Sequence, residues 1–291
     1  MVTLLSLPKE IVREKLLAFL KEDVGQGDIT SQLVVERDAL AEAEIVAKER
    51  GVAAGLDEAQ ILLEAINLEC RPLLSDGDKF EKNTVLMQIK GNARDLLTVE
   101  RTLLNIVSRM SGIATKTRLL QEAAITVNPS VKVASTRKVS PGSLYFDKRA
   151  VALGGGDTHR LHLDDLILIK DNHKALVGGI REAVRRAKAG SFSKKIEVEV
   201  STADDAVEAA EAGADIVMFD NMTPSPIRDA VKLLESKGVR KRLVLEASGG
   251  IDETNILEYA RSGADILSLG SLTHSARALD LSLEVKGLKR K

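Results

Sequence analysis

Cationic side chains are concentrated in the middle of the chain, where they could bind a small anionic ligand. They are Arg137 and Lys138 in STRKVSPG, His159 and Arg160 in GGGDTHR, and Lys170 in LILIKDNH. The whole chain is nearly neutral, with 42 Lys and Arg against 43 Asp and Glu. A local cluster in a balanced chain favours a specific anionic metabolite. Nucleic acid or a membrane surface would call for a broad basic face instead.

From about residue 130, short apolar runs alternate with helix-like segments, several of which end in Gly. The apolar runs are residues 131–136, 166–171, 195–200, 215–220, 243–250 and 265–271. This alternation predicts parallel β-α units. Glu197 and Glu199 share one face of their strand by the two-residue period, whereas a two-sided buried sheet is apolar on both faces. The pattern therefore predicts an α/β fold with a complete or open (β/α) barrel.

The N-terminal part, residues 1–112, is expected to be a separate α+β domain, followed by a barrel over 113–274. Its pattern predicts an amphipathic helix near residues 7–23 and a turn in VGQGDITS, then mixed strands and helices. The segment 98–124 reads as one or two helices, with a break at Ser111-Gly112. The basic tail, residues 275–291, is expected either to fray in solvent or to pack back on the N-terminal domain.

Composition excludes several classes of protein. The single cysteine, Cys70, allows no internal disulfide and fits a reducing, cytoplasmic setting. No apolar run approaches the length of a membrane span, and the N-terminus does not read as a signal peptide. Trp is absent and aromatic residues make up 2% of the chain, which disfavours base stacking on an aromatic platform. We therefore expect neither a nucleic acid nor a membrane as partner.

Barrel enzymes build their active sites at the C-terminal ends of the strands. In chain order these ends carry Arg137 and Lys138, Lys170, Glu199, Asp220, Ser248-Gly249-Gly250, and Gly270-Ser271. The two glycine turns predict a phosphate site, because backbone N–H groups can approach an anion there. The two carboxylates could hold Mg²⁺ together with substrate oxygens, or sugar hydroxyls; the alternative is an interior salt bridge with Lys170.

The Arg and Lys side chains near these strand ends suit carboxylates, since a guanidinium group binds a carboxylate through two hydrogen bonds. Arg101 in VERTLLNIVSRMSGIAT could equally be a surface charge of a helix. His159 and His162 are three residues apart and His173 lies nearby, so a zinc site is possible. No clear third ligand follows at the spacing usual in zinc sites.

The chain resembles the quinolinate phosphoribosyltransferase family, the carboxylating nicotinate-nucleotide pyrophosphorylases. The resemblance runs nearly from end to end. It is carried by EDVGQGDITS, ERTLLNIVSRMSGIATKTR, STRKVSPG, AVALGGGDTHRLHLDDLILIKDNH, IEVEV, DIVMFDNM, LEASGGI and LGSLTHS. It implies a type II phosphoribosyltransferase, with an N-terminal α/β sandwich and an open barrel. It also implies the Mg²⁺-dependent reaction of quinolinate with phosphoribosyl pyrophosphate (PRPP), giving nicotinate mononucleotide, pyrophosphate and CO₂ for NAD biosynthesis.

The resemblance further implies roles for individual residues and a homodimer or higher homo-oligomer. The quinolinate carboxylates would be held by Arg137, His159, Arg160 and Lys170, with Arg101 entering from the neighbouring subunit. PRPP would be bound by Lys138 on the pyrophosphate side, by Glu199 and Asp220 with the metal, and by Ser248, Gly249, Gly250, Gly270 and His274 at the 5′-phosphate.

The chain departs from the family pattern at three positions. Ser135 and Thr158 stand where the family usually has Asp and often has Asn, and Ser143 follows Pro141-Gly142 where a basic residue is common. The set of cations is intact. Two alternatives remain beside the transferase. One is a paralogue of the molybdenum-transport-associated type that acts on another anionic acceptor. The other is a barrel that binds a phosphorylated metabolite without transferring anything.

Overall fold

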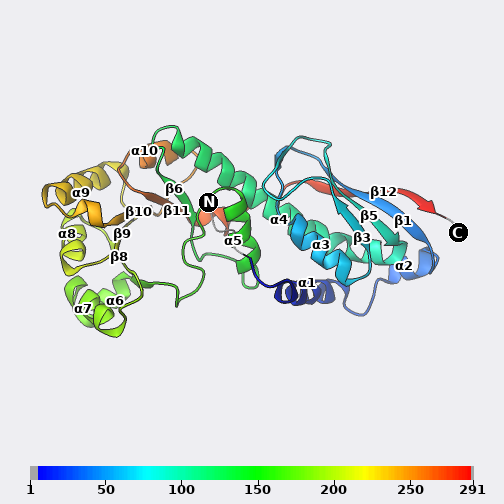
Figure 1. The fold of residues 1–291 in the computed structure, drawn as a ribbon, viewed down its shortest axis with the longest axis horizontal. Helices are drawn as coiled ribbons and strands as arrows, with labels where there is room; N and C mark the ends of the chain where they lie inside the picture. Colours follow the sequence, from blue (N-terminus) through cyan, green and yellow to red (C-terminus); the bar gives the residue numbers. More distant parts are fainter. Residues whose placement is uncertain (1–5, 290–291) are drawn as a thin grey trace. The chain divides into compact units, whose positions relative to one another are not determined.

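The computed structural model describes residues 6–289, which form two compact units (Figure 1). The first unit comprises residues 1–118, 145–155 and 276–291, and the second comprises residues 119–144 and 156–275. This division falls six residues beyond the expected boundary at 112/113, and it assigns the segment 145–155 to the first unit.

The second unit is built on a six-stranded parallel sheet. Its strands are β6 (Lys132–Ser135), β7 (Ile167–Ile169), β8 (Ile196–Val200), β9 (Ile216–Asp220), β10 (Val244–Ser248) and β11 (Ile266–Leu269). All six predicted strands are present, and they pair in the order β6-β11-β10-β9-β8-β7. Consecutive strands are neighbours except β6 and β7, which form the two edges. The sheet is therefore a barrel that is open between β6 and β7, as predicted.

Helices between the strands cover the outer side of this sheet (Figure 1). They are α6 (Asp171–Val177), α7 (Ile180–Gly190), α8 (Ala203–Ala212), α9 (Pro224–Ser236) and α10 (Ile256–Ala260). Helix α8 illustrates how the sequence sets their ends. The Thr202 hydroxyl accepts a hydrogen bond from the backbone N–H of Asp205, and Gly213 ends the helix with φ of 94°. The outer face of the sheet buries apolar side chains such as Val198, Val217 and Leu245.

The first unit contains a four-stranded antiparallel sheet with helices. Its elements are α1 (Lys9–Val24), α2 (Ile29–Val34), β1 (Leu40–Ala47), β2 (Gly51–Val52), α3 (Leu56–Ala65), β3 (Glu69–Pro72), β4 (Lys79–Phe80), β5 (Val85–Asn92), α5 (Leu144–Leu153) and β12 (Leu281–Lys289). The sheet has the order β12-β1-β5-β3. Helix α3 packs on β3, and α1 packs on α3. The predicted turn in VGQGDITS contains the start of α2, where the Asp28 side chain accepts from the N–H of Ser31.

The predicted helix break at Ser111-Gly112 is wrong, because α4 (Ala93–Ile125) is one continuous helix of 33 residues. These two residues serve close packing. The Ser111 hydroxyl accepts from the N–H of Ala54, and a Cβ on Gly112 would lie 1.9 Å from the carbonyl oxygen of Arg277. Small residues in mid-helix thus allow other segments of the first unit to approach the helix backbone.

The C-terminal tail is not frayed over the residues that the structure describes. Residues 281–289 form β12, which pairs antiparallel with β1 along its whole length, with one register shift at Glu42/Ala43. Residues 290–291 lie outside the described part. None of the helices between residues 6 and 289 has the length and apolar character that crossing a membrane requires.

Candidate active site

The register of the parallel sheet brings the predicted strand-end residues of β8, β9 and β10 onto one face. Met218 on β9 is level with Glu199 on one side and Glu246 on the other, and Asp220 is level with Ser248. Neighbours at one level of a parallel sheet point the same way, as do residues two apart along a strand. Glu199, Asp220, Glu246 and Ser248 therefore share the inner face of the barrel.

Lys170 joins this group directly after β7. Its Nζ lies 2.5 Å from Oε1 of Glu199, whose side chain is 12% exposed, while the Lys170 side chain is half exposed. Lys174 on α6 supports the same corner, because its Nζ donates to the carbonyl oxygen of Glu199 at 2.8 Å. The ion pair that the sequence offered as an alternative use of Lys170 is thus present in the structure.

Lys138 and His274 meet at Gly270, where β11 ends. A Cβ on Gly270 would lie 3.1 Å from Cδ of Lys138 and 3.0 Å from Cδ2 of His274, so both side chains lie against the glycine backbone. The Thr273 hydroxyl donates to the carbonyl oxygen of Lys138 at 2.8 Å. Three of the residues assigned to PRPP by resemblance are therefore neighbours, although up to 136 positions separate them in the sequence.

The turn after β10 consists of two glycines whose backbones lie in the left-handed region. Gly249 has φ of 97° and Gly250 has φ of 66°. Asn221 packs against this turn, with its N–H donating to the carbonyl oxygen of Ser248 at 2.8 Å and its side-chain amide donating to Asp220 at 3.0 Å. Asn221 was not among the predicted residues. The sequence signal that could have identified Asn221 is its position directly after Asp220.

A short turn carries His159 and Arg160 along the open edge of β6. Asp157 forms a β-bridge with β6. Its N–H donates to the carbonyl oxygen of Val133, and its own carbonyl oxygen accepts from the N–H of Ser135. Two of the departures from the family pattern meet here, because the Ser135 hydroxyl donates to the carbonyl oxygen of Thr158 at 3.3 Å.

The His159 side chain reaches two carboxylates on the inner face. Its Nε2 lies 3.0 Å from Oε2 of Glu246 and 3.4 Å from Oε2 of Glu197, and these glutamates are 1% and 0% exposed. Glu246 was missed by the sequence analysis, although its two-residue spacing from Ser248 placed it on the same face.

Protonation of this cluster follows from its burial and its contacts. Burial disfavours the imidazolium, but the two carboxylates outweigh it and raise the pKa of His159 to about 10. The cluster therefore binds a proton at neutral pH. The N–H of Arg160 donates to Nδ1 of His159 at 2.7 Å, which leaves that nitrogen without a proton. Because Nδ1 is an acceptor, the proton of the cluster lies on the Nε2 side, between His159 and the two carboxylates. Burial and the charge of Glu246 also raise the pKa of the Glu197 carboxyl group.

Arg160 and Arg137 are close enough to repel. Partial burial, followed by the charge of Arg137, lowers the pKa of the Arg160 guanidinium. Neither side chain forms a hydrogen bond or ion pair with another residue of the range 6–289. The charges of Glu197, Glu199 and Asp165 partly offset the lowering of the Arg160 pKa. Two adjacent cations that form no direct ion pair within residues 6–289 favour a ligand with clustered negative charge.

The donor set near Glu199 and Asp220 fits a hard divalent cation. Carboxylate oxygens are the ligands that Mg²⁺ prefers, and the ion is commonly held by one or two carboxylates together with substrate phosphates. Asp220 is partly exposed at the end of β9 and Glu199 is buried near the end of β8. These two carboxylates are compatible with a metal ion whose remaining ligands are substrate oxygens.

Arg101 lies on α4 in the first unit. Its side chain is exposed and pairs with no residue that the structure describes. Thr98 and Thr102 are on the same helical face, and their hydroxyl groups donate to Asp28 at 3.4 Å and to Asp23 at 2.8 Å. These two bonds hold the connection between α1 and α2 to α4, and Arg101 is an exposed cation next to Thr102 on the same helix.

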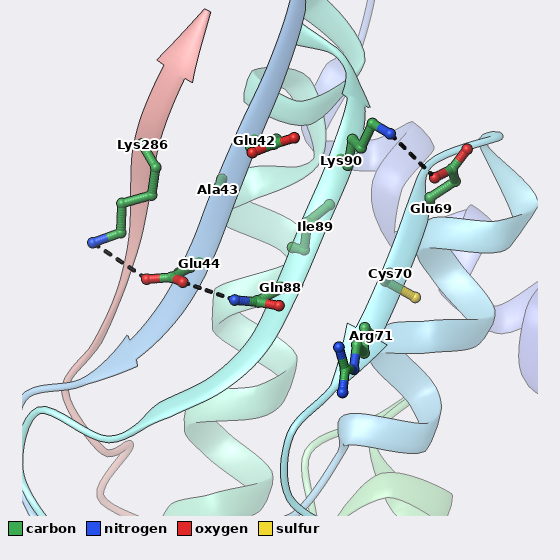
Figure 2. A pocket seen from close by; sticks show the side chains of 10 residues that line it. All are labelled: Glu42, Ala43, Glu44, Glu69, Cys70, Arg71, Gln88, Ile89, Lys90 and Lys286. Carbon is green, nitrogen blue, oxygen red and sulfur yellow. Dashed lines mark hydrogen bonds and ion pairs between the residues drawn. The ribbon is translucent and has the colours of Figure 1, made fainter.

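A separate hollow of about 380 Å³ lies on the face of the first unit's sheet (Figure 2). Most of its charged side chains take part in ion pairs or hydrogen bonds across the hollow. Glu44 lies 3.3 Å from Nζ of Lys286 and accepts from Gln88, while Lys90 lies 3.9 Å from Glu69. Cys70 at its margin has a pKa raised by burial, which disfavours a reactive thiolate. Arg71, which also lines the hollow, is exposed and pairs with none of residues 6–289, so the hollow carries a single unpaired cation where the barrel face carries two adjacent ones.

Comparisons with known proteins agree on one family. Residues 28–111 match the model for the N-terminal domain of quinolinate phosphoribosyl transferase, and residues 113–284 match the model for its C-terminal domain. The chain is 47% identical to the probable carboxylating nicotinate-nucleotide pyrophosphorylase of Methanothermobacter thermautotrophicus, covering 96% of this chain and 99% of that protein. It is 41% identical to the Bacillus subtilis protein of the same name, covering 92% and 91%.

Solved structures give the same result. The nicotinate-nucleotide pyrophosphorylase of Francisella tularensis superposes with a TM-score of 0.89 at 37% identity, covering 97% of this chain and 98% of that one. NadC from Streptococcus pyogenes gives 0.89 at 38% identity, covering 98% and 99%. Both domains and their order are matched along nearly the whole length, so the chain belongs to the quinolinate phosphoribosyltransferase family.

Proposed function

We propose that this protein transfers the phosphoribosyl group of PRPP to quinolinate with loss of CO₂, giving nicotinate mononucleotide and pyrophosphate for NAD biosynthesis. The observation that carries the proposal is the inner face of the barrel. Unpaired cations on one side and two strand-end carboxylates with glycine turns on the other suit a dicarboxylate beside a phosphorylated sugar. The single free cysteine fits a reducing, cytoplasmic enzyme.

Arg137, Arg160 and Lys170 bind the quinolinate carboxylates in this proposal, with His159 behind Arg160. Lys138 faces the pyrophosphate side. The 5′-phosphate lies at the turns around Ser248, Gly249, Gly250 and Gly270, near His274. A site of this kind must hold several negative charges in one cavity, which bidentate arginines and backbone N–H groups can do. Arg101 completes the site of a neighbouring subunit in a homodimer or higher homo-oligomer.

The reaction needs orientation and charge more than acid or base groups. The pyridine nitrogen forms a bond to C1 of the ribose as the bond to pyrophosphate breaks, and positive charge develops on the sugar ring. Glu199 and Asp220 stabilise that charge. Loss of CO₂ then leaves an electron pair on the ring carbon beside the cationic nitrogen, where a proton from water adds. Fixing the two substrates against each other supplies much of the rate.

Glu199 and Asp220 would hold Mg²⁺ together with oxygens of PRPP. Bound Mg²⁺ would neutralise charge on the departing pyrophosphate. The chain's own contribution is to fix the carboxylates. Lys170 pairs with the Glu199 carboxylate, and Asn221 donates to Asp220.

An assay with purified protein, PRPP and Mg²⁺ tests the proposal. Quinolinate labelled in the carboxyl group next to the ring nitrogen should release labelled CO₂ in equal amount to nicotinate mononucleotide, and EDTA should stop the reaction. Nicotinate should not replace quinolinate. Turnover of nicotinate without quinolinate turnover would contradict the decarboxylating reaction, and turnover of neither would contradict the transferase.

A further inference from the structure

The imidazole ring of His159 has both nitrogen atoms engaged by the protein. Nδ1 accepts the backbone N–H of Arg160 at 2.7 Å, and Nε2 lies 3.0 Å from Oε2 of Glu246. A neutral imidazole has one donor and one acceptor, so this ring has no free nitrogen for a ligand. Direct contact between His159 and a substrate carboxylate would require one of these two bonds to break.

The backbone around His159 is held as firmly as its ring. His159 has φ of 52°, in the left-handed region that is sterically strained for a residue with a side chain. Its N–H donates to Oδ1 of Asp157 at 2.6 Å, and Asp157 is bridged to the edge of β6. A strained residue persists only where its surroundings enforce it, and such positions cluster at functional sites.

The carboxylates behind His159 are unusual for a barrel interior. Glu246 and Glu197 are almost fully buried, and Oε1 of Glu246 and both oxygens of Glu197 have no hydrogen-bond partner within residues 6–289. Burying two carboxyl groups costs several kcal/mol in the absence of compensating contacts. Burial of both carboxyl groups beside His159 is explained if they fix the geometry of a residue that the reaction needs.

We propose that Glu246, supported by Glu197, is a positioning residue that fixes the ring of His159. His159 in turn fixes the backbone of Arg160 and does not contact the substrate; we call this arrangement of Glu246, His159 and Arg160 the bracket. The inference rests on the proposed function, in which Arg160 binds a quinolinate carboxylate. A bidentate guanidinium contact depends on the direction of the arginine backbone, which the bond from its N–H to Nδ1 determines.

A double-mutant cycle tests this bracket. His159→Ala should weaken quinolinate binding about 10- to 100-fold, as expected when a binding group is misplaced. In an Arg160→Ala background the same change should have less than about a twofold effect, because coupled residues are non-additive. PRPP affinity should be unchanged in both backgrounds. Equal, additive losses would overturn the proposal, since they would mean that His159 binds the substrate independently.

Matched variants separate orientation from simple damage to the fold. His159→Asn keeps an acceptor near the position of Nδ1 and should recover part of the quinolinate affinity that His159→Ala loses. Glu246→Gln keeps a polar partner for Nε2 and should bind quinolinate better than Glu246→Leu. Thermal unfolding of each variant checks the fold. Equal losses in Glu246→Gln and Glu246→Leu, with unchanged melting temperatures, would contradict an orienting role.

A measurement without substrate separates this inference from the proposed function. The chain has four histidines, so ¹⁵N spectra of the labelled side chains can be assigned with the His159→Asn variant. Wild-type His159 should show an unprotonated Nδ1 and a protonated Nε2. A proton on Nδ1 would overturn the bracket even if the enzyme turns over quinolinate. The expected tautomer without quinolinate turnover would instead count against the proposed reaction alone.

Discussion

Lys170 and Glu199 form an ion pair of 2.5 Å across the ends of β7 and β8, on the inner face of the open barrel. In the proposed reaction one partner binds quinolinate and the other faces PRPP and its metal. The pair therefore places the binding groups for two substrates next to each other, and each should influence the other's ligand.

Lys170→Met is expected to raise KM for quinolinate, because it removes a charged hydrogen-bond donor while keeping the length of the side chain. Loss of such a bond costs about 1.5–3 kcal/mol, or roughly 10- to 150-fold in kcat/KM. Steady-state kinetics with either substrate varied will measure this. Lys174→Met is the control, because the Lys174 Nζ reaches the backbone carbonyl oxygen of Glu199 and the Asp171 carboxylate, not the Glu199 carboxylate. A smaller effect for Lys170→Met than for Lys174→Met would contradict the role of Lys170.

Gly249→Ala is expected to impair PRPP binding more than Gly250→Ala. A Cβ on Gly249 would lie 2.2 Å from Oδ1 and 3.0 Å from the backbone nitrogen of Asn221, whereas a Cβ on Gly250 meets nothing within 4 Å. Both positions have positive φ, so backbone strain of about 1–2 kcal/mol is common to the two variants. KM for PRPP and melting temperature should be measured together. Equal KM values would show that the approach of Asn221 to this turn does not shape the phosphate site.

Arg101→Ala and Lys170→Ala are each expected to be nearly inactive, and mixing them should restore activity. If each site takes Arg101 from one subunit and Lys170 from another, random exchange in a symmetric dimer leaves about a quarter of the sites intact. Activity after mixing, with differently tagged subunits to measure exchange, checks this. The control is each variant mixed with itself. Exchange without recovery of activity would contradict a shared site.

Asp76→Asn is expected to stabilise the first unit at neutral and higher pH. Burial raises the pKa of Asp76 from 3.8 to about 7, and its partners are the N–H of Leu56 at 2.9 Å and Arg149 at 3.6 Å. A carboxyl group with a raised folded-state pKa stabilises the fold below pH 4, and this contribution is lost as pH rises through 7. Melting temperatures from pH 4 to 8 should therefore fall less steeply in the variant.

Asp57→Asn provides the comparison for that prediction. The Asp57 side chain is 64% exposed and also pairs with Arg149, at 2.6 Å, so it shares the partner but not the burial. Exposed ion pairs contribute little to stability. If Asp57→Asn flattens the pH dependence as much as Asp76→Asn does, burial of Asp76 is not its cause.

Several features of the fold could be predicted from local pattern because they depend on local physics. The six parallel strands were found from apolar runs that alternate with helix-like segments, and the sharing of one face by Glu197 and Glu199 followed from the two-residue period. The glycine stop of α8 is also local, since Gly213 adopts a left-handed conformation. The break expected in α4 was wrong, because Ser111 and Gly112 respond to segments far along the chain.

By itself, the sequence determined the order of the strands, the charges at their ends and the resemblance to one family. Tertiary structure decided which of these charges are paired. The bond between His159 and Glu246 joins positions 87 residues apart, and its partners are chosen by sheet register and by the open edge of β6. Pairing of this kind depends on the direction of side chains across neighbouring strands, which no local pattern encodes. The cation segment of the sequence thus contains two arginines whose side chains pair with none of residues 6–289, a lysine bound to Glu199, and a histidine with both ring nitrogens bonded.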